Sequence, residues 1–144
     1  MVDLQNWVEN NLEEGPQWLL FDRHRLISET IYGPIIRGYA EEGFDSMVGM
    51  TMWMTRFYEI EPLIIYCMPP YKTVCGNVRD DPDNTAVAWR IEAIYQAYAA
   101  RAAIDYALSP GSTVIWDYTA DGKEQEPLLA LDVHIEAMKK RTHA

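Results

Sequence analysis

The chain has few cysteines, few bases and no long apolar run, and each shortage excludes a class of protein. Its two cysteines, Cys67 and Cys75, are too few for a disulfide framework; we expect both to be small buried residues in a reducing compartment. No apolar run approaches the roughly 20 residues that span a bilayer, and residues 1–10 lack a basic-then-apolar signal pattern. We therefore expect a cytoplasmic protein without a membrane partner.

Positive charge is also scarce. Twelve Lys and Arg residues stand against twenty-two Asp and Glu residues, which gives a net charge of −10. Such a chain is repelled by nucleic-acid backbones and by anionic membranes, so no nucleic-acid polymer is expected as a partner. The acids are interspersed with aromatic residues, so solubility explains them better than mimicry of DNA.

Metal and nucleophile motifs are missing as well. The three histidines, His24, His134 and His143, include no pair at i, i+4, and the cysteines form no C-x-x-C. No serine lies in a G-x-S-x-G context. The sequence therefore indicates neither a zinc site nor a serine nucleophile. We expect His24 to be a surface or supporting residue, and Tyr71, Tyr95 and Tyr98 to be packing residues with satisfied hydroxyls.

What remains is a globular α/β pattern. Apolar residues make up 49% of the 144 residues and charged residues 24%, which fits a single domain over 1–144. We expect an N-terminal helix within 1–16, ended by Gly15-Pro16, and an α/β core over 17–144. Short apolar runs predict strands at 18–21, 63–67 and 113–119. Helical patterns occupy 28–39 (interrupted at Gly33-Pro34), 45–59, 71–78, 84–108 and 127–140.

This alternation of strands and helices predicts a three-layer fold with a small, mainly parallel sheet flanked by helices. The carboxyl ends of parallel strands meet at one edge, where ligands bind in open α/β sheets. Asp22-Arg23 follows the first expected strand, and Asp117-Tyr118 lies at the end of the third. Arginine offers a planar fork of donors to phosphate, and a neighbouring acid can ligate magnesium. An ordinary strand, turn and helix, with Arg23 in a structural salt bridge, is the open alternative.

One block carries a family resemblance. The run FDRHRLISETIYGPIIRG, residues 21–38, resembles the Asp-Arg segment of the P-loop nucleotide kinases, closest to the thymidylate-kinase-like and deoxynucleoside-kinase-like enzymes of bacteriophages. Three further blocks follow in the same order as in that family: LIIYCMPPYKTVCGNV at 63–78, IEAIYQAYAARAA at 91–103 and VIWDYT at 114–119. The resemblance extends from residue 18 to the C-terminus, and it implies a cytoplasmic protein of a phage-infected bacterial host.

The resemblance implies roles for particular residues. Arg23 would contact the phosphate of a nucleoside or nucleotide, and Asp22 would lie near the metal–phosphate centre or the acceptor hydroxyl. The base and sugar would be surrounded by Tyr32, Arg37, Trp53 and Phe57. Arg79 would belong to the mobile lid that acts on the transferred phosphoryl group. Three aspartates follow Arg79 within 80–83, and their charge opposes that role.

The sequence departs from the family at the phosphate-binding loop. No G-x-x-x-x-G-K-[ST] occurs anywhere, and the strand that precedes this loop is also missing. The resemblance thus implies a truncated P-loop-kinase-like fold without its first strand, which would leave two strand edges open. Either the neighbouring strands close together, or another chain fills the gap, or the chain is a fragment. We expect a homo-oligomer, because a two-fold pair is the commonest remedy.

Two functions follow from these residues. We favour a non-catalytic binding or regulatory protein that retains a (deoxy)nucleotide acceptor pocket and binds a nucleotide or another protein, such as a host factor. The alternative is an ATP-dependent (deoxy)nucleoside or nucleoside monophosphate kinase, here a fragment or completed by another chain. Only that alternative would use ATP and magnesium as cofactors.

Overall fold

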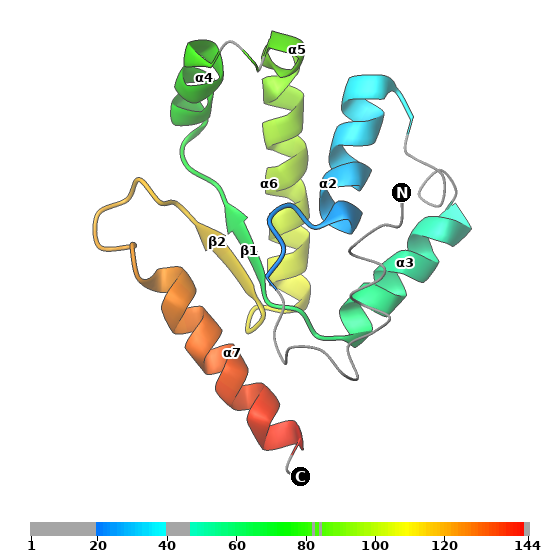
Figure 1. Cartoon of the computed structure of the whole chain (residues 1–144), viewed down its shortest axis with the longest axis vertical. Helices are drawn as coiled ribbons and strands as arrows, with labels where there is room; N and C mark the ends of the chain where they lie inside the picture. Colours follow the sequence, from blue (N-terminus) through cyan, green and yellow to red (C-terminus); the bar gives the residue numbers. More distant parts are fainter. Residues whose placement is uncertain (1–19, 40–46, 82, 84, 143–144) are drawn as a thin grey trace.

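The computed structural model describes residues 20–39, 47–81, 83 and 85–142. In this part of the chain a two-stranded parallel sheet packs against helices, so the fold is α/β and mostly helical (Figure 1). The helix predicted within 1–16 lies outside the described residues. None of the described helices is long and apolar enough to cross a bilayer.

The sheet consists of β1 (Ile64–Cys67) and β2 (Thr113–Trp116), with Ile64 opposite Thr113 and Cys67 opposite Trp116. The parallel pairing predicted for the apolar runs at 63–67 and 113–119 is confirmed. β2 ends three residues earlier than predicted. There the Asp117 carboxylate accepts hydrogen bonds from the backbone N–H and the hydroxyl of Thr119, at 2.9 and 2.6 Å, and this local turn ends the strand.

The strand predicted at 18–21 is wrong for the two residues of it that the structure describes. Leu20 and Phe21 belong to no strand, and Leu20 is 96% exposed rather than buried. Residues 18–19 lie outside the described part. An apolar run becomes a strand only where an edge is available for pairing, and the described sheet contains β1 and β2 alone.

The helix predicted over 28–39 begins earlier and changes geometry. α2 (Arg25–Tyr32) is followed directly by the π-helix η1 (Gly33–Arg37). The break expected at Gly33-Pro34 is therefore a change of helix type: Pro34 has no N–H to donate, so the α-helical ladder cannot continue through it. Gly38, with φ +83°, ends the segment in the left-handed region that glycine adopts without strain.

Three other helices lie close to their predicted positions. The helix predicted over 45–59 is α3 (Met47–Glu59), and the helix predicted over 71–78 is α4 (Tyr71–Asp80). The last helix, predicted over 127–140, is α7 (Glu126–Thr142). Residues 45–46 lie outside the described part. The last turn of α7 is basic, which suits the negative end of the helix dipole.

The single helix predicted over 84–108 is wrong. The chain forms α5 (Thr85–Ala88) and α6 (Ile91–Leu108), separated by Trp89 and Arg90. Arg90 has φ −117° and ψ 7°, outside helical geometry. Its guanidinium stacks on the Trp89 ring at 3.9 Å and donates a hydrogen bond to the Ile35 carbonyl of η1. A contact between residues far apart in the sequence therefore accompanies the break.

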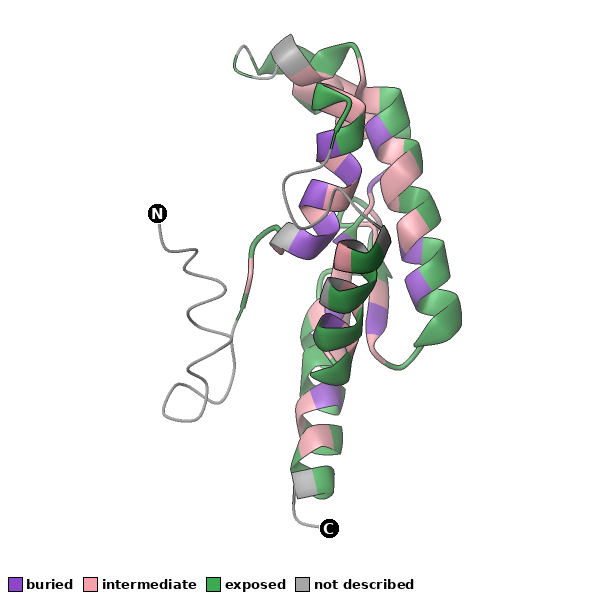
Figure 2. Cartoon of the chain, turned by 90° about the vertical axis from the view of Figure 1, so that its right-hand side faces the viewer, coloured by how far each residue is buried: buried purple, intermediate pink, exposed green. Residues whose placement is uncertain are grey.

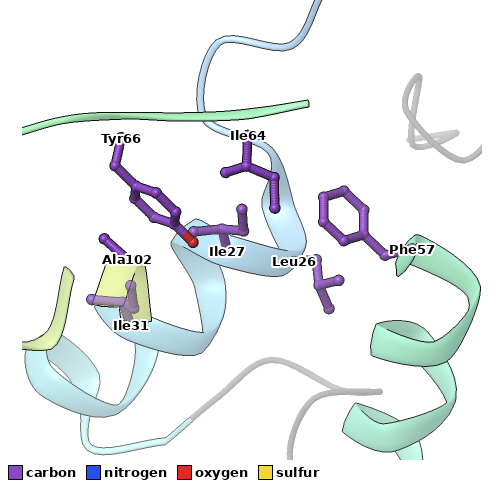
Figure 3. Packing of buried hydrophobic residues seen from close by; sticks show 7 residues of the cluster. All are labelled: Leu26, Ile27, Ile31, Phe57, Ile64, Tyr66 and Ala102. Atoms are coloured by element: carbon purple, nitrogen blue, oxygen red, sulfur yellow. The ribbon is translucent and has the colours of Figure 1, made fainter. Parts of the chain in front are cut away.

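The core lies between β1, α2, α3 and α6. Ile64 and Tyr66, two residues apart on one face of β1, point at α2 (Figure 3). The buried cluster comprises Leu26, Ile27, Ile31, Phe57, Ile64, Tyr66 and Ala102. Figure 2 shows that α7 is exposed over most of its surface. The prediction that both cysteines are buried is also wrong, because Cys67 is exposed at the end of β1 and Cys75 is half-buried.

Candidate functional site

Asp22 and Arg23 lie in the segment that leads into α2. Segment 20–24 reaches the level of the β1 arrowhead before it enters α2 (Figure 1). Asp22 and Arg23 are both exposed there. Although Cys67 is exposed by its surface area, partial desolvation raises the pKa of its thiol at the end of β1, and the negative charge of Asp22 raises it further. Leu20 and Phe21 do not form the strand that was predicted to bring Asp22 to the edge of the sheet, so a role for Asp22 at a strand end stays a prediction.

His24 fixes the loop that carries Asp22 and Arg23. As N-cap of α2, its Nδ1 accepts a hydrogen bond from the Leu26 N–H at 3.3 Å, and its carbonyl accepts from Ile27 and Ser28 at 3.0 Å. Its ring packs against Phe57, with the centroids 4.5 Å apart. His24 is half-buried and supports the loop, as the sequence led us to expect.

Arg23 differs from five other arginines of the chain. Five arginines each form an ion pair with a carboxylate or a hydrogen bond with a carbonyl: Arg37, Arg79, Arg90, Arg101 and Arg141. Arg23 forms no ion pair or hydrogen bond with any residue that the structure describes. It is exposed and has a positive φ of 61°, a backbone conformation that costs a non-glycine residue about 1–2 kcal/mol. The structural salt bridge considered as its alternative role is absent from the described residues, and among them no side chain competes with an anion for this guanidinium.

Tyr32, the last residue of α2, contacts α6. Its ring meets that of Tyr98, on α6, edge to face with the centroids 6.0 Å apart. Burial raises the pKa of Tyr98 to about 12; Tyr32 contributes to the rise, and the positive charge of Arg23 opposes it.

Arg37 and Phe57 are occupied by other contacts. Arg37 forms an ion pair with the buried carboxylate of Glu29, across the turn at Gly33, and lies 5.5 Å from the centre of the Tyr39 ring. Phe57 is 8% exposed and belongs to the core, so it offers little surface to a ligand. Their roles around a base or sugar stay predictions.

The remaining two candidates are not brought to Arg23 by any described contact. Trp53 lies on α3, and its side chain is outside the described part of the structure. Arg79 is exposed in the last turn of α4 and pairs with its neighbour Asp80 at 3.1 Å. A lid role for Arg79 stays a prediction.

A buried polar network was not anticipated from the sequence. Asp105, 2% exposed, accepts hydrogen bonds from the hydroxyls of Tyr58, at 2.6 Å, and Tyr66. Arg101 Nε lies 3.3 Å from both Asp105 oxygens, and Arg101 also donates to the Tyr58 hydroxyl at 3.0 Å. Burial, followed by the hydrogen bond to Asp105, raises the pKa of both tyrosines. The sequence did contain one sign of this network: Arg101 and Asp105 stand four residues apart in an alanine-rich helix, the spacing at which opposite charges pair.

The residues available for magnesium differ from those available for ATP. Within the described residues, no group of three or more His, Cys, Asp or Glu side chains could hold a metal ion. Asp22 alone could serve a magnesium ion that also has phosphate oxygens as ligands, since that ion binds through one or two carboxylates and phosphate. The sequence contains no phosphate-binding loop that would hold ATP, so the residues present do not fit it.

Comparison with protein-family models, with curated proteins and with solved structures finds no match to this chain.

Proposed function

We propose that this protein binds a phosphorylated (deoxy)nucleoside at the carboxyl end of β1, as a non-catalytic relative of the phage-type P-loop nucleotide kinases. The observation that carries the proposal is Arg23, an exposed arginine without a partner among the described residues, held in a left-handed backbone conformation beside Asp22. Strained residues of this kind cluster at binding sites, where the surrounding structure holds them in place.

The charge of the molecule supports a small phosphorylated ligand over a polymer. A net charge of −10 opposes association with a polyanion, whereas one exposed guanidinium with five fixed donors can hold a single phosphate in a bidentate geometry. Asp22 is one residue away, so a divalent cation carried by the ligand would relieve the repulsion between the carboxylate and the phosphate.

Calorimetric titration of the full chain tests the proposal. The four deoxynucleoside monophosphates and the corresponding nucleosides are titrated into wild type, Arg23→Ala and Arg141→Ala. Arg141 is the matched control, since it is an exposed arginine that already pairs with Glu61 and is no candidate for the site. We expect at least one monophosphate to bind, Arg23→Ala to weaken its binding by about 1–3 kcal/mol, and Arg141→Ala to leave it unchanged.

Two results would contradict the proposal. Equal affinities in wild type and Arg23→Ala would make Arg23 irrelevant to the ligand, and equal affinities for nucleoside and monophosphate would remove the phosphate from recognition. Micromolar binding of magnesium-ATP would instead favour the kinase alternative.

A further inference from the structure

α7 presents a stripe of side chains whose order is symmetric about Val133. The residues Glu126, Leu129, Val133, Ala137 and Lys140 follow one another at intervals of three, four, four and three, which keeps all five on one side of the helix. Glu126 is half-buried, Leu129 is 63% exposed, Val133 is 68% exposed, and the last two are exposed as well. Most of the surface of this helix is uncovered (Figure 2). The stripe thus begins with an acid, ends with a base and is apolar between them.

The charged residues of α7 are divided along its length. The acids come first and the bases last, and they are equal in number: Glu126, Asp132 and Glu136, then Lys139, Lys140 and Arg141. The helix is therefore neutral, whereas the whole chain has a net charge of −10. Two copies of so acidic a chain repel each other, but they can meet at α7 without that repulsion. Because the acids and the bases lie toward opposite ends, antiparallel contact brings unlike charges together.

The surface beside the stripe is hollowed. An open depression of about 460 Å³ follows the second half of the stripe and is lined by Asp132, Val133, Glu136, Ala137 and Lys140. Ala137 has the smallest side chain of these, so a larger apolar side chain from another helix can enter beside it. The charge of Glu136 is compensated within the helix, because Lys139 pairs with it at 2.8 Å.

We propose that α7 is a self-association surface, on which a second copy of the chain packs its own α7 antiparallel, about a two-fold axis at Val133. Such an axis sets Val133 of one copy against Val133 of the other. It also sets Leu129 against Ala137 and Glu126 against Lys140, each of these contacts occurring twice. Leu129 of each copy then fills the depression beside Ala137 of the other. Lys140, which has no ion pair or hydrogen bond with any residue that the structure describes, gains a carboxylate.

The surface is small, so the dimer is weak. α7 has 17 residues and is about 26 Å long, and one pair of such helices lies at the low end of specific interfaces. We therefore expect a dimer that forms and dissociates with protein concentration. The homo-oligomer expected from open strand edges would thus be held by a helix instead. This inference is independent of the proposed function, because α7 carries neither Asp22 nor Arg23.

Sedimentation equilibrium over a series of protein concentrations tests the inference. Val133→Glu sets two carboxylates against each other at the two-fold axis, and it leaves the core intact because Val133 is already 68% exposed. Val48→Glu is the matched control, since Val48 lies on α3 and is 72% exposed. We expect Val48→Glu to dimerise as wild type does, and Val133→Glu to dimerise at least about tenfold more weakly.

Two charge reversals test the antiparallel orientation. Glu126→Lys sets lysine against lysine, and Lys140→Glu sets glutamate against glutamate, so each variant alone should dimerise more weakly than wild type. An equimolar mixture of the two restores unlike charges at both ends, and we expect it to form a mixed dimer more tightly than either variant pairs with itself. In a parallel pair, wild type would already oppose like charges, and neither reversal would weaken it.

Several results would overturn the inference. A wild type that stays monomeric across the whole concentration series has no such surface. Equal dimerisation of wild type and Val133→Glu would place the contact elsewhere, and so would equal losses in Val133→Glu and Val48→Glu. Charge reversals that leave dimerisation unchanged, or a mixture no tighter than its two components, would exclude the antiparallel pairing.

Discussion

At the scale of single residues, the candidate site is defined by side chains that the fold leaves without partners. Arg23 has no ion pair or hydrogen bond with any described residue, whereas Arg101, Asp105, Tyr58 and Tyr66 satisfy one another. A satisfied buried network rigidifies the core, while an exposed guanidinium is hydrated and can exchange its water for an anion. The contrast separates groups that hold the fold from groups available for binding.

The backbone of Arg23 allows stability and binding to be separated. Glycine adopts φ 61° without the steric cost that arginine carries, so we expect Arg23→Gly to raise the free energy of unfolding by up to about 1 kcal/mol. The same variant should lose monophosphate binding as Arg23→Ala does. Urea denaturation and calorimetry measure the two quantities on one preparation. A variant that is less stable than wild type would show that the Arg23 side chain supports the fold.

The place predicted for Asp22 and Arg23 rested on a strand that the structure does not show. The expected strand at 18–21 was to bring both residues to the edge of the sheet, but Leu20 and Phe21 belong to no strand, and Asp22 and Arg23 lie just before His24, the N-cap of α2. The contact between Tyr32 and Tyr98, about 66 positions apart in the chain, arises because α6 packs against α2, and no spacing rule contains it.

At the scale of elements, local signals located most helices, and long-range contacts decided where predictions failed. α3 and α7 lie where apolar periodicity and capping residues put them. The apolar run at 18–21 has the composition of a strand, yet Leu20 and Phe21 find no edge in the described sheet. The break between α5 and α6 accompanies a hydrogen bond from Arg90 to η1, which composition does not reveal.

The α2–η1 junction depends on a glycine for space rather than for backbone freedom. A Cβ on Gly33 would lie 2.5 Å from Glu29 Oε1, 2.9 Å from Arg37 Nη2 and 3.0 Å from the Tyr39 carbonyl oxygen. The Glu29 carboxylate is buried, so displacing it would pull apart the Glu29–Arg37 ion pair and weaken the compensation of a buried charge.

We therefore expect Gly33→Ala to lower the free energy of unfolding by about 1–3 kcal/mol, the usual range for overpacking. Gly76→Ala is the matched control: Gly76 lies inside α4, and a methyl group there would point into open space, so alanine should stabilise the helix by up to about 1 kcal/mol. Thermal and urea denaturation give both values. A Gly33→Ala protein as stable as wild type would mean that the ion pair shifts at no cost.

At the scale of the whole molecule, α7 joins the rest of the chain through few buried side chains. It packs along β2, its Arg141 pairs with Glu61, and it exposes Leu128, Leu129 and Val133. His134 is 8% exposed and is the one buried residue among the described positions of α7. The docking of this helix is therefore sensitive to the charge of a single imidazole.

Burial lowers the pKa of His134 below its ordinary value of 6.5. Below about pH 6.5 the unfolded chain takes up a proton more readily than the folded chain, so the free energy of unfolding falls as the solution is acidified. Above that pH both states hold a neutral imidazole, and the contribution is constant. Lys139 lowers the pKa of Glu136 on the same helix from an ordinary value of 4.5, so this carboxylate stays ionised between pH 5 and 8. The chain also contains His24 and His143, so a variant of His134 is needed to assign the effect.

We expect urea denaturation of wild type to show stability falling from pH 7 to pH 5, with a slope of at most about 1.4 kcal/mol per pH unit from this one group. His134→Gln removes the titrating group, so its stability curve should be flatter over the same interval, whatever its absolute stability at pH 7. Comparison of slopes rather than of stabilities keeps the test valid if glutamine packs poorly. Parallel curves for the two proteins would show that acid acts elsewhere, and would remove His134 as the group that couples α7 docking to pH.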